Sequence, residues 1–115
     1  GIIEKGENPD DVARREMVEE TGLGVTHLTK LFHYLVSPGG SSESVFLYCG
    51  RVDATNAGGV HGMTDEHENI RVFSVSATQA FELMDQGRII NAMTIVALQW
   101  LKANRDRLRA DWMND

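Results

Sequence analysis

The first 23 residues of the chain decide the fold, and they read GIIEKGENPDDVARREMVEETGL (residues 1–23). Asn8 followed by Pro9 predicts the start of a helix, because asparagine caps helix N-termini and proline is tolerated at the first helical position. Gly22 predicts the end of that helix, because glycine readily takes the left-handed conformation found after the last turn. The segment therefore predicts an extended start, a turn and a helix that runs to Thr21.

The predicted helix carries three glutamates on one face, because Glu16, Glu19 and Glu20 stand at positions i, i+3 and i+4. Like charges at this spacing destabilise a helix, and the C-terminal half of a helix disfavours anions. Clustered carboxylates hold Mg²⁺ beside substrate phosphates in many proteins, so the pattern indicates a metal site. For an isolated Glu-x-x-Glu-Glu, a solvated acidic face is the more common interpretation, and the helix alone leaves both open.

The composition of the 115 residues argues against several classes of function. There are 17 Asp and Glu against 11 Lys and Arg, a net charge of −6, which argues against broad electrostatic binding to nucleic acid. The length fits one domain, and the single cysteine, Cys49, rules out a disulfide within these residues and fits a reducing, cytoplasmic compartment. Uncharged stretches fall short of the roughly 18–20 apolar residues that span a bilayer, so no membrane contact is expected.

The rest of the chain predicts strands flanked by helices. Runs of β-branched and aromatic residues predict strands, and a glycine-containing stretch without apolar periodicity predicts a long loop. The predicted elements are strands 26–36, 44–52 and 70–75, a long loop over 54–69, and helices 77–86 and 91–112. This mixture predicts an α/β (α+β) layered domain.

The spacing of the first segment adds a specific signal. Gly1, Glu7 and the stretch 15–23 (REMVEETGL) fit the pattern Gly-x5-Glu-x7-Arg-Glu-U-x-Glu-Glu-x-Gly-U, with U apolar, at every fixed position. This is the Nudix box, and the chain resembles the Nudix hydrolases, which cleave a nucleoside diphosphate linked to another moiety. The resemblance implies a Nudix fold, with a mixed β-sheet sandwiched between helices.

The resemblance also implies roles for the charged residues of the box. Glu16 and Glu20 would be the main ligands of Mg²⁺, for which Mn²⁺ would substitute, and Glu19 would ligate the ion or orient its ligands. Arg15 would hold these carboxylates in place by charge-assisted hydrogen bonds. Glu7 would support this arrangement or act as an occasional ligand.

A second match concerns the substrate. Pro38, in a Ser-Pro-Gly-Gly stretch (37–40), lies 15 residues after Leu23, and a proline so placed resembles a mark of the ADP-ribose pyrophosphatases within the family. An ordinary turn is the alternative, because Pro-Gly favours turns by itself. Pro38 and Gly39 are therefore expected at the substrate, and Glu43 resembles a substrate-contacting acid of the bacterial enzymes. The expected reaction converts ADP-ribose to AMP and ribose 5-phosphate.

The long loop at about 54–69 is the third match. In the bacterial ADP-ribose pyrophosphatases an acidic loop closes over the substrate and supplies the general base, and the resemblance places that base at Glu66. Glu68 is the second acidic candidate, as a metal contact or a backup base. Sequence reasoning alone does not separate these two from Asp65, and a solvated acidic loop is the alternative.

The resemblance covers all 115 residues, but family members carry a long N-terminal region before the box. That region supplies the first strands of the sheet, part of the adenine pocket and a swapped dimer interface. We therefore expect residues 1–115 to be the C-terminal part of a Nudix domain, with the box at 1–23, a catalytic loop at about 54–69 and a last helix at about 91–112. A homodimer would form through the N-terminal region.

Three other interpretations remain. The chain could belong to a Nudix hydrolase of another nucleoside diphosphate derivative, such as a nucleotide sugar or a dinucleoside polyphosphate, against which Pro38 argues. It could be a non-catalytic Nudix module that binds ADP-ribose, against which the intact glutamates Glu16, Glu19 and Glu20 argue. It could also be a plain acidic structural domain.

Overall fold

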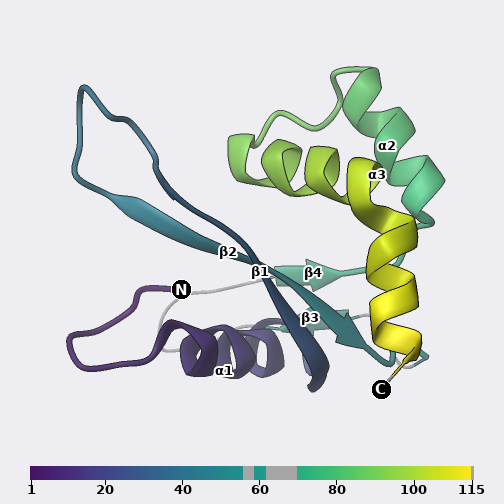
Figure 1. Cartoon of the computed structure of the whole chain (residues 1–115), viewed down its shortest axis with the longest axis horizontal. Helices are drawn as coiled ribbons and strands as arrows, with labels where there is room; N and C mark the ends of the chain where they lie inside the picture. Colours follow the sequence, from purple (N-terminus) through teal and green to yellow (C-terminus); the bar gives the residue numbers. More distant parts are fainter. Residues whose placement is uncertain (56–58, 62–69, 115) are drawn as a thin grey trace. The chain divides into compact units, whose positions relative to one another are not determined.

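The computed structural model describes residues 1–55, 59–61 and 70–114 (Figure 1). For residues 59–61 it describes the backbone only. The chain divides into two compact units, each described here by itself. The first consists of Gly1–Leu28 and Gly50–Ser74, and the second of Thr29–Cys49 and Val75–Asp115.

The first unit is built around helix α1 (Pro9–Thr21). The side chain of Asn8 caps its N-terminus by accepting a 2.8 Å hydrogen bond from the backbone N–H of Asp10. Gly22 ends the helix in the left-handed conformation, with φ 74°, and its N–H donates to the carbonyl of Val18 at 2.8 Å. Both predicted ends of this helix are therefore confirmed.

Two short strands contact α1 within this unit. Strand β3 (Gly59–His61) pairs antiparallel with β4 (Ile70–Val72), in the register Gly59↔Val72, Val60↔Arg71 and His61↔Ile70. The prediction of an uninterrupted loop over 54–69 was wrong, because β3 has one aliphatic residue and shows no apolar periodicity. The predicted strand 70–75 is also shorter than expected, since β3 offers partners at only three positions.

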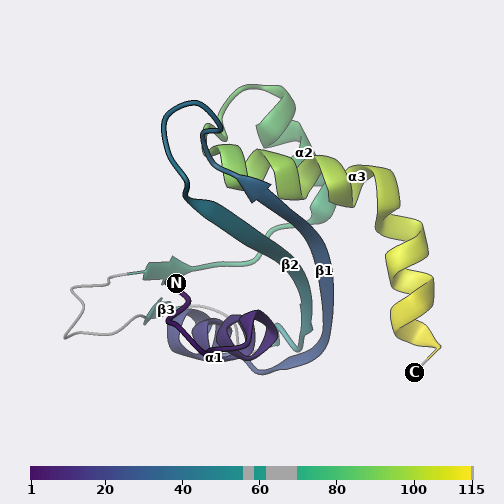
Figure 2. The same cartoon turned by 60° about the vertical axis from the view of Figure 1, so that its left-hand side comes forward.

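Strands β1 (Val25–Leu35) and β2 (Ser44–Val52) form a long two-stranded ribbon, visible in Figures 1 and 2. The hydroxyl of Thr26 donates to the carbonyl of Arg51 at 3.2 Å near one end, and the N–H of Val36 donates to the carbonyl of Glu43 at 3.0 Å just beyond the other. These pairs show that the strands run antiparallel. The two predicted strands are confirmed to within one residue at each end.

Two helices of the second unit pack against each other, α2 (Ala77–Asp85) and α3 (Ala92–Met113). Ser76 caps the first and Asn91 the second, each by accepting a hydrogen bond from a backbone N–H of the first turn. Helix α3 bends along its length (Figures 1 and 2). The side chain of Asn104 donates a 2.8 Å hydrogen bond to the carbonyl of Trp100 one turn earlier, a contact that favours bending.

The apolar core of the described residues is small. Val12, Leu47 and Leu108 are buried, whereas large apolar side chains such as Ile2, Phe73 and Ile90 are mostly exposed. The expected mixture of helices and strands is confirmed, but the described strands form two separate pairs and not one mixed sheet, because the outer edges of β1 and β2 meet no other described strand. Within the described part of the chain, no helix combines the length and apolarity needed to cross a membrane.

Candidate functional site

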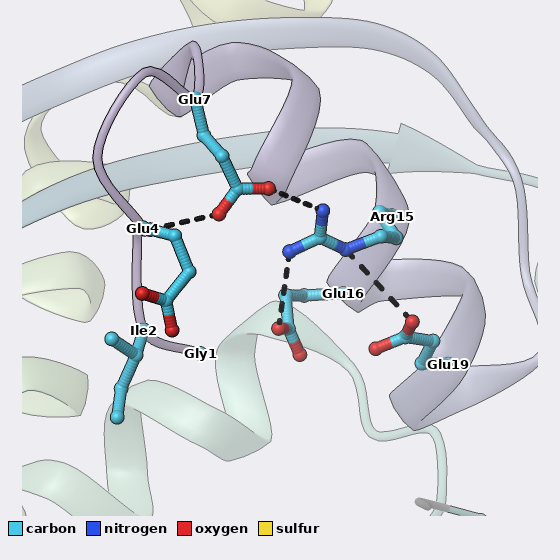
Figure 3. A pocket seen from close by; sticks show the side chains of 7 residues that line it. All are labelled: Gly1, Ile2, Glu4, Glu7, Arg15, Glu16 and Glu19. Carbon is cyan, nitrogen blue, oxygen red and sulfur yellow. Dashed lines mark hydrogen bonds and ion pairs between the residues drawn. The ribbon is translucent and has the colours of Figure 1, made fainter.

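A cavity of about 610 Å³ lies in the first unit, where the segment before α1 faces the helix (Figure 3). The segment contributes three side chains and Gly1, and the middle and last turn of α1 contribute the rest. The lining residues are Gly1, Ile2, Glu4, Glu7, Arg15, Glu16 and Glu19. Four of the seven are glutamates, so the cavity has a strongly negative lining around one arginine.

Arg15 is the centre of this group, and Figure 3 shows three carboxylates turned toward its guanidinium. Its Nη1 lies 2.6 Å from Oε2 of Glu7, which is a direct charge-assisted hydrogen bond. Its other nitrogens lie 4.0 Å from Oε1 of Glu16 and 3.9 Å from Oε1 of Glu19. Of the three carboxylates, Arg15 thus forms a close hydrogen bond only with Glu7. The longer distances to Glu16 and Glu19 leave their carboxylate oxygens available to a further cation.

Glu7 also fixes the segment that precedes the helix. Its second oxygen, Oε1, accepts a 2.8 Å hydrogen bond from the N–H of Glu4, and its own N–H donates to the carbonyl of Glu4 at 3.1 Å. Gly6, with φ 87°, makes this tight turn possible, because that conformation is costly for other residues. Through Glu7, the guanidinium of Arg15 ties the turn to the helix.

The charges of this pair are mutually stabilised. The hydrogen bond from Arg15, followed by the one from the N–H of Glu4, lowers the pKa of the Glu7 carboxyl below its ordinary value. The Glu7 carboxylate in turn raises the pKa of Arg15, with smaller contributions from Glu19 and Glu16. Glu7 and Arg15 therefore both stay ionised at neutral pH.

Gly1 lies against the side chain of Glu16. A Cβ atom at this position would overlap the carboxyl group of Glu16. The absence of a side chain at Gly1 therefore allows the backbone to approach Glu16 closely, and any other residue would push the carboxylate away.

The third glutamate of the motif takes a different place. Glu16 and Glu19 line the cavity, whereas Glu20 is half-buried and is not part of the lining. Among the residues that the structure describes, no three His, Cys, Asp or Glu side chains converge well enough to hold a metal ion by themselves. Two carboxylates on an open cavity still fit Mg²⁺, which proteins commonly hold through one or two carboxylates while water and substrate phosphates complete the shell.

Three other predicted site residues, Pro38, Gly39 and Glu43, are not among the lining residues of this cavity. Pro38 and Gly39 belong to a turn of the second unit, in which the N–H groups of Gly40 and Ser41 donate to the carbonyl of Ser37 at 3.2 and 3.0 Å. Glu43 follows this turn, with its N–H donating to the hydroxyl of Ser41 at 3.0 Å. The predicted catalytic residues Glu66 and Glu68 lie outside the described residues.

Sequence reasoning did not anticipate two lining residues, Ile2 and Glu4. They fall within the five unspecified positions between Gly1 and Glu7, so the motif gives no signal for them. The hydrogen bonds between Glu4 and Glu7 hold Glu4 beside the cavity.

Comparisons with known proteins agree with the motif. A family model described as "NUDIX domain" matches residues 1–92. The chain is 47% identical over 112 residues to the ADP-ribose pyrophosphatase of Escherichia coli (strain K12), covering 97% of this chain and 54% of that protein. It is 43% identical over 112 residues to the ADP-ribose pyrophosphatase of Haemophilus influenzae, covering 97% and 52%.

A more distant relative carries a different name. The GDP-mannose pyrophosphatase of Pectobacterium atrosepticum is 36% identical over 95 residues, covering 80% of this chain and 47% of that protein. The chain thus spans about half the length of the curated relatives it matches.

Proposed function

Because this chain belongs to the Nudix family, we propose that it carries the metal- and diphosphate-binding site of an ADP-ribose pyrophosphatase. One observation carries the proposal: Arg15 is bonded directly to Glu7, which leaves Glu16 and Glu19 open to a cavity. The 47% identity to the E. coli ADP-ribose pyrophosphatase over 97% of the chain supports the choice of substrate.

We propose Mg²⁺ as the cofactor, with Mn²⁺ as a substitute. Glu16 and Glu19 would hold the ion from the cavity, and Glu20 would complete the ligand set expected from the motif. When bound, the ion would offset the charge of the diphosphate and lower the pKa of a coordinated water. Arg15 would position the carboxylates without binding the ion.

The proposed reaction is a hydrolysis in which a water oxygen attacks one phosphorus of ADP-ribose. The bond from that phosphorus to the bridging oxygen breaks, and the products are AMP and ribose 5-phosphate. Glu66 is the proposed base that removes the proton of the attacking water, and Glu68 is the second candidate. Pro38, Gly39 and Glu43 are proposed to contact the substrate.

We also propose that the full-length protein is a homodimer. Large apolar side chains are exposed in each unit, including Ile2 and Phe73 in the first and Ile90 and Met113 in the second. Exposed apolar surface of this kind is typical of protein interfaces. Light scattering of the full-length protein tests this, and a monomer at micromolar concentration would contradict it.

The activity is tested by measuring AMP formation from ADP-ribose by the full-length protein, with and without Mg²⁺. We expect Mg²⁺-dependent AMP formation that Glu16→Gln abolishes. Asp11→Asn is a matched control, because it removes a carboxylate of the same helix that does not line the cavity. A preference for GDP-mannose would show another Nudix activity, and ADP-ribose binding without turnover would show a binding module.

A further inference from the structure

A second group of side chains lies on the β1–β2 ribbon within the second unit. The imidazole of His33 stacks on the ring of Phe46, with the ring centroids 3.9 Å apart and the planes only 9° from parallel. Its Nε2 lies 3.0 Å from the hydroxyl oxygen of Ser44. The stack and the hydrogen bond together fix the orientation of the imidazole.

The positively charged side chain of Lys30 lies near this stack. The Nζ of Lys30 lies 5.3 Å from the ring centroid of Phe46 and 5.9 Å from that of Tyr48, within the range of cation–π attraction. Regular alternation would place Lys30 and His33 on opposite faces of a strand. The burial pattern of β1 instead changes phase between them, so both are exposed and both meet Phe46.

A cavity of about 320 Å³ opens beside the stack. This volume is at the lower end of ligand sites, which begin at about 300 Å³. Its lining residues are His33, Tyr34, Leu35, Ser42 and Ser44. The lining thus offers one imidazole, one phenol and two hydroxyls, with no carboxylate. His33 is exposed and is one of the lining residues of this cavity.

We propose that this cavity binds the base of a nucleotide, which stacks on the face of His33 that is turned away from Phe46. A planar base would extend the existing stack of Phe46 and His33, and histidine is among the side chains on which bases stack. The hydroxyls of Tyr34, Ser42 and Ser44 can donate to or accept from the polar edge of a base. The charge of Lys30 favours a ligand that also carries phosphate. None of its residues line the carboxylate cavity, but Ser42 and Ser44 flank Glu43, so this site adjoins a residue that is proposed to contact ADP-ribose.

Two probes separate base recognition from simple anion binding. AMP and ribose 5-phosphate both carry a ribose and a phosphate, but only AMP carries a base. We expect AMP, added to the full-length protein without Mg²⁺, to shift the imidazole NMR signals of His33, and ribose 5-phosphate to leave them in place. Equal shifts with both probes, or no shift with AMP, would overturn the proposal. The measurement is repeated in Glu16→Gln. An unchanged AMP shift in a variant that has lost hydrolysis would show that base binding does not require the hydrolytic site.

Variants of His33 test the stacking itself. His33→Ala is expected to weaken AMP binding by roughly 5- to 150-fold, the range expected for loss of one base stack. His33→Phe keeps an aromatic face and should bind AMP within a few-fold of the wild type, which also shows that the ribbon still folds. His27→Ala is the control, because it removes the other described histidine of β1, which lies outside this cavity. Unchanged binding in His33→Ala, or equal loss in both His33 variants, would refute stacking on this ring.

Discussion

Glu7→Gln is expected to weaken Mg²⁺ binding by about 10- to 100-fold, the usual effect of removing a group that orients metal ligands. The distances around Arg15 explain why. The guanidinium is 2.6 Å from Glu7 but 4.0 and 3.9 Å from Glu16 and Glu19. A neutral amide at position 7 would hold Arg15 less firmly. The guanidinium, which stays charged, then needs to move only about 1 Å to form a charge-assisted hydrogen bond with either carboxylate and compete with the ion.

The assay is calorimetric titration of Mn²⁺, together with the Mg²⁺ concentration that gives half-maximal hydrolysis of ADP-ribose. Glu4→Gln is the matched control, because Glu4 lines the same cavity but contacts Glu7 through its backbone N–H, which the substitution keeps. It removes the same charge without freeing Arg15, so we expect a much smaller loss. Equal losses of metal affinity in the two variants would show that the effect comes from net charge. Unchanged affinity in Glu7→Gln would refute the role of the ion pair.

Four further predictions concern the same unit and the proposed base. Glu66→Gln should lower kcat by about 10²- to 10⁴-fold while Mn²⁺ affinity is unchanged; full activity in steady-state assays would contradict the base assignment. Gly1→Ala should raise the Mg²⁺ concentration for half-maximal activity, because the added methyl overlaps the carboxyl of Glu16; an unchanged requirement would show that this carboxylate moves without cost. Because the hydrogen bond from Arg15 lowers the pKa of Glu7 from 4.5, the ion pair should stabilise the fold above that pH. The stability difference between wild type and Glu7→Gln in urea should therefore shrink as the pH falls through the lowered pKa, and a growing difference would be inconsistent with it. Asn8→Ala should reduce the free energy of unfolding by about 1 kcal/mol through loss of the cap on α1; a change near zero in chemical denaturation would show that the cap is dispensable.

Local signals in the sequence were sufficient for the elements that depend on their own residues. The ends of α1 follow from Asn8 and Gly22, whose hydrogen bonds are made within the helix or at its first turn. The β1–β2 ribbon follows from two runs of strand-forming residues joined by a turn around Pro38. Strand β3 could not be predicted, because a three-residue strand is defined by its partner β4 and not by its own composition.

The stack of His33 on Phe46 likewise could not be predicted from the sequence. The sequence places Lys30 and His33 three residues apart on one strand, and strict alternation assigns them to opposite faces. The change of phase within β1 brings both to Phe46. Because that change depends on how β1 pairs with β2, the two side chains could be connected only once the pairing was known.

Helical geometry explains why Glu16 and Glu19 line the cavity and Glu20 does not. At about 100° per residue, Glu19 lies about 40° from Arg15 around the helix axis, Glu16 about 100° and Glu20 about 140°. The turn that carries Glu7 approaches from the side of Arg15, because the guanidinium binds Glu7 directly. Glu19 and Glu16 are the two of these three glutamates nearest to that side, so they line the cavity, whereas Glu20 lies about 40° beyond Glu16 and is not a lining residue. The i, i+3, i+4 spacing shows that three carboxylates share a face, but the direction from which the preceding turn meets the helix decides which of them face the cavity.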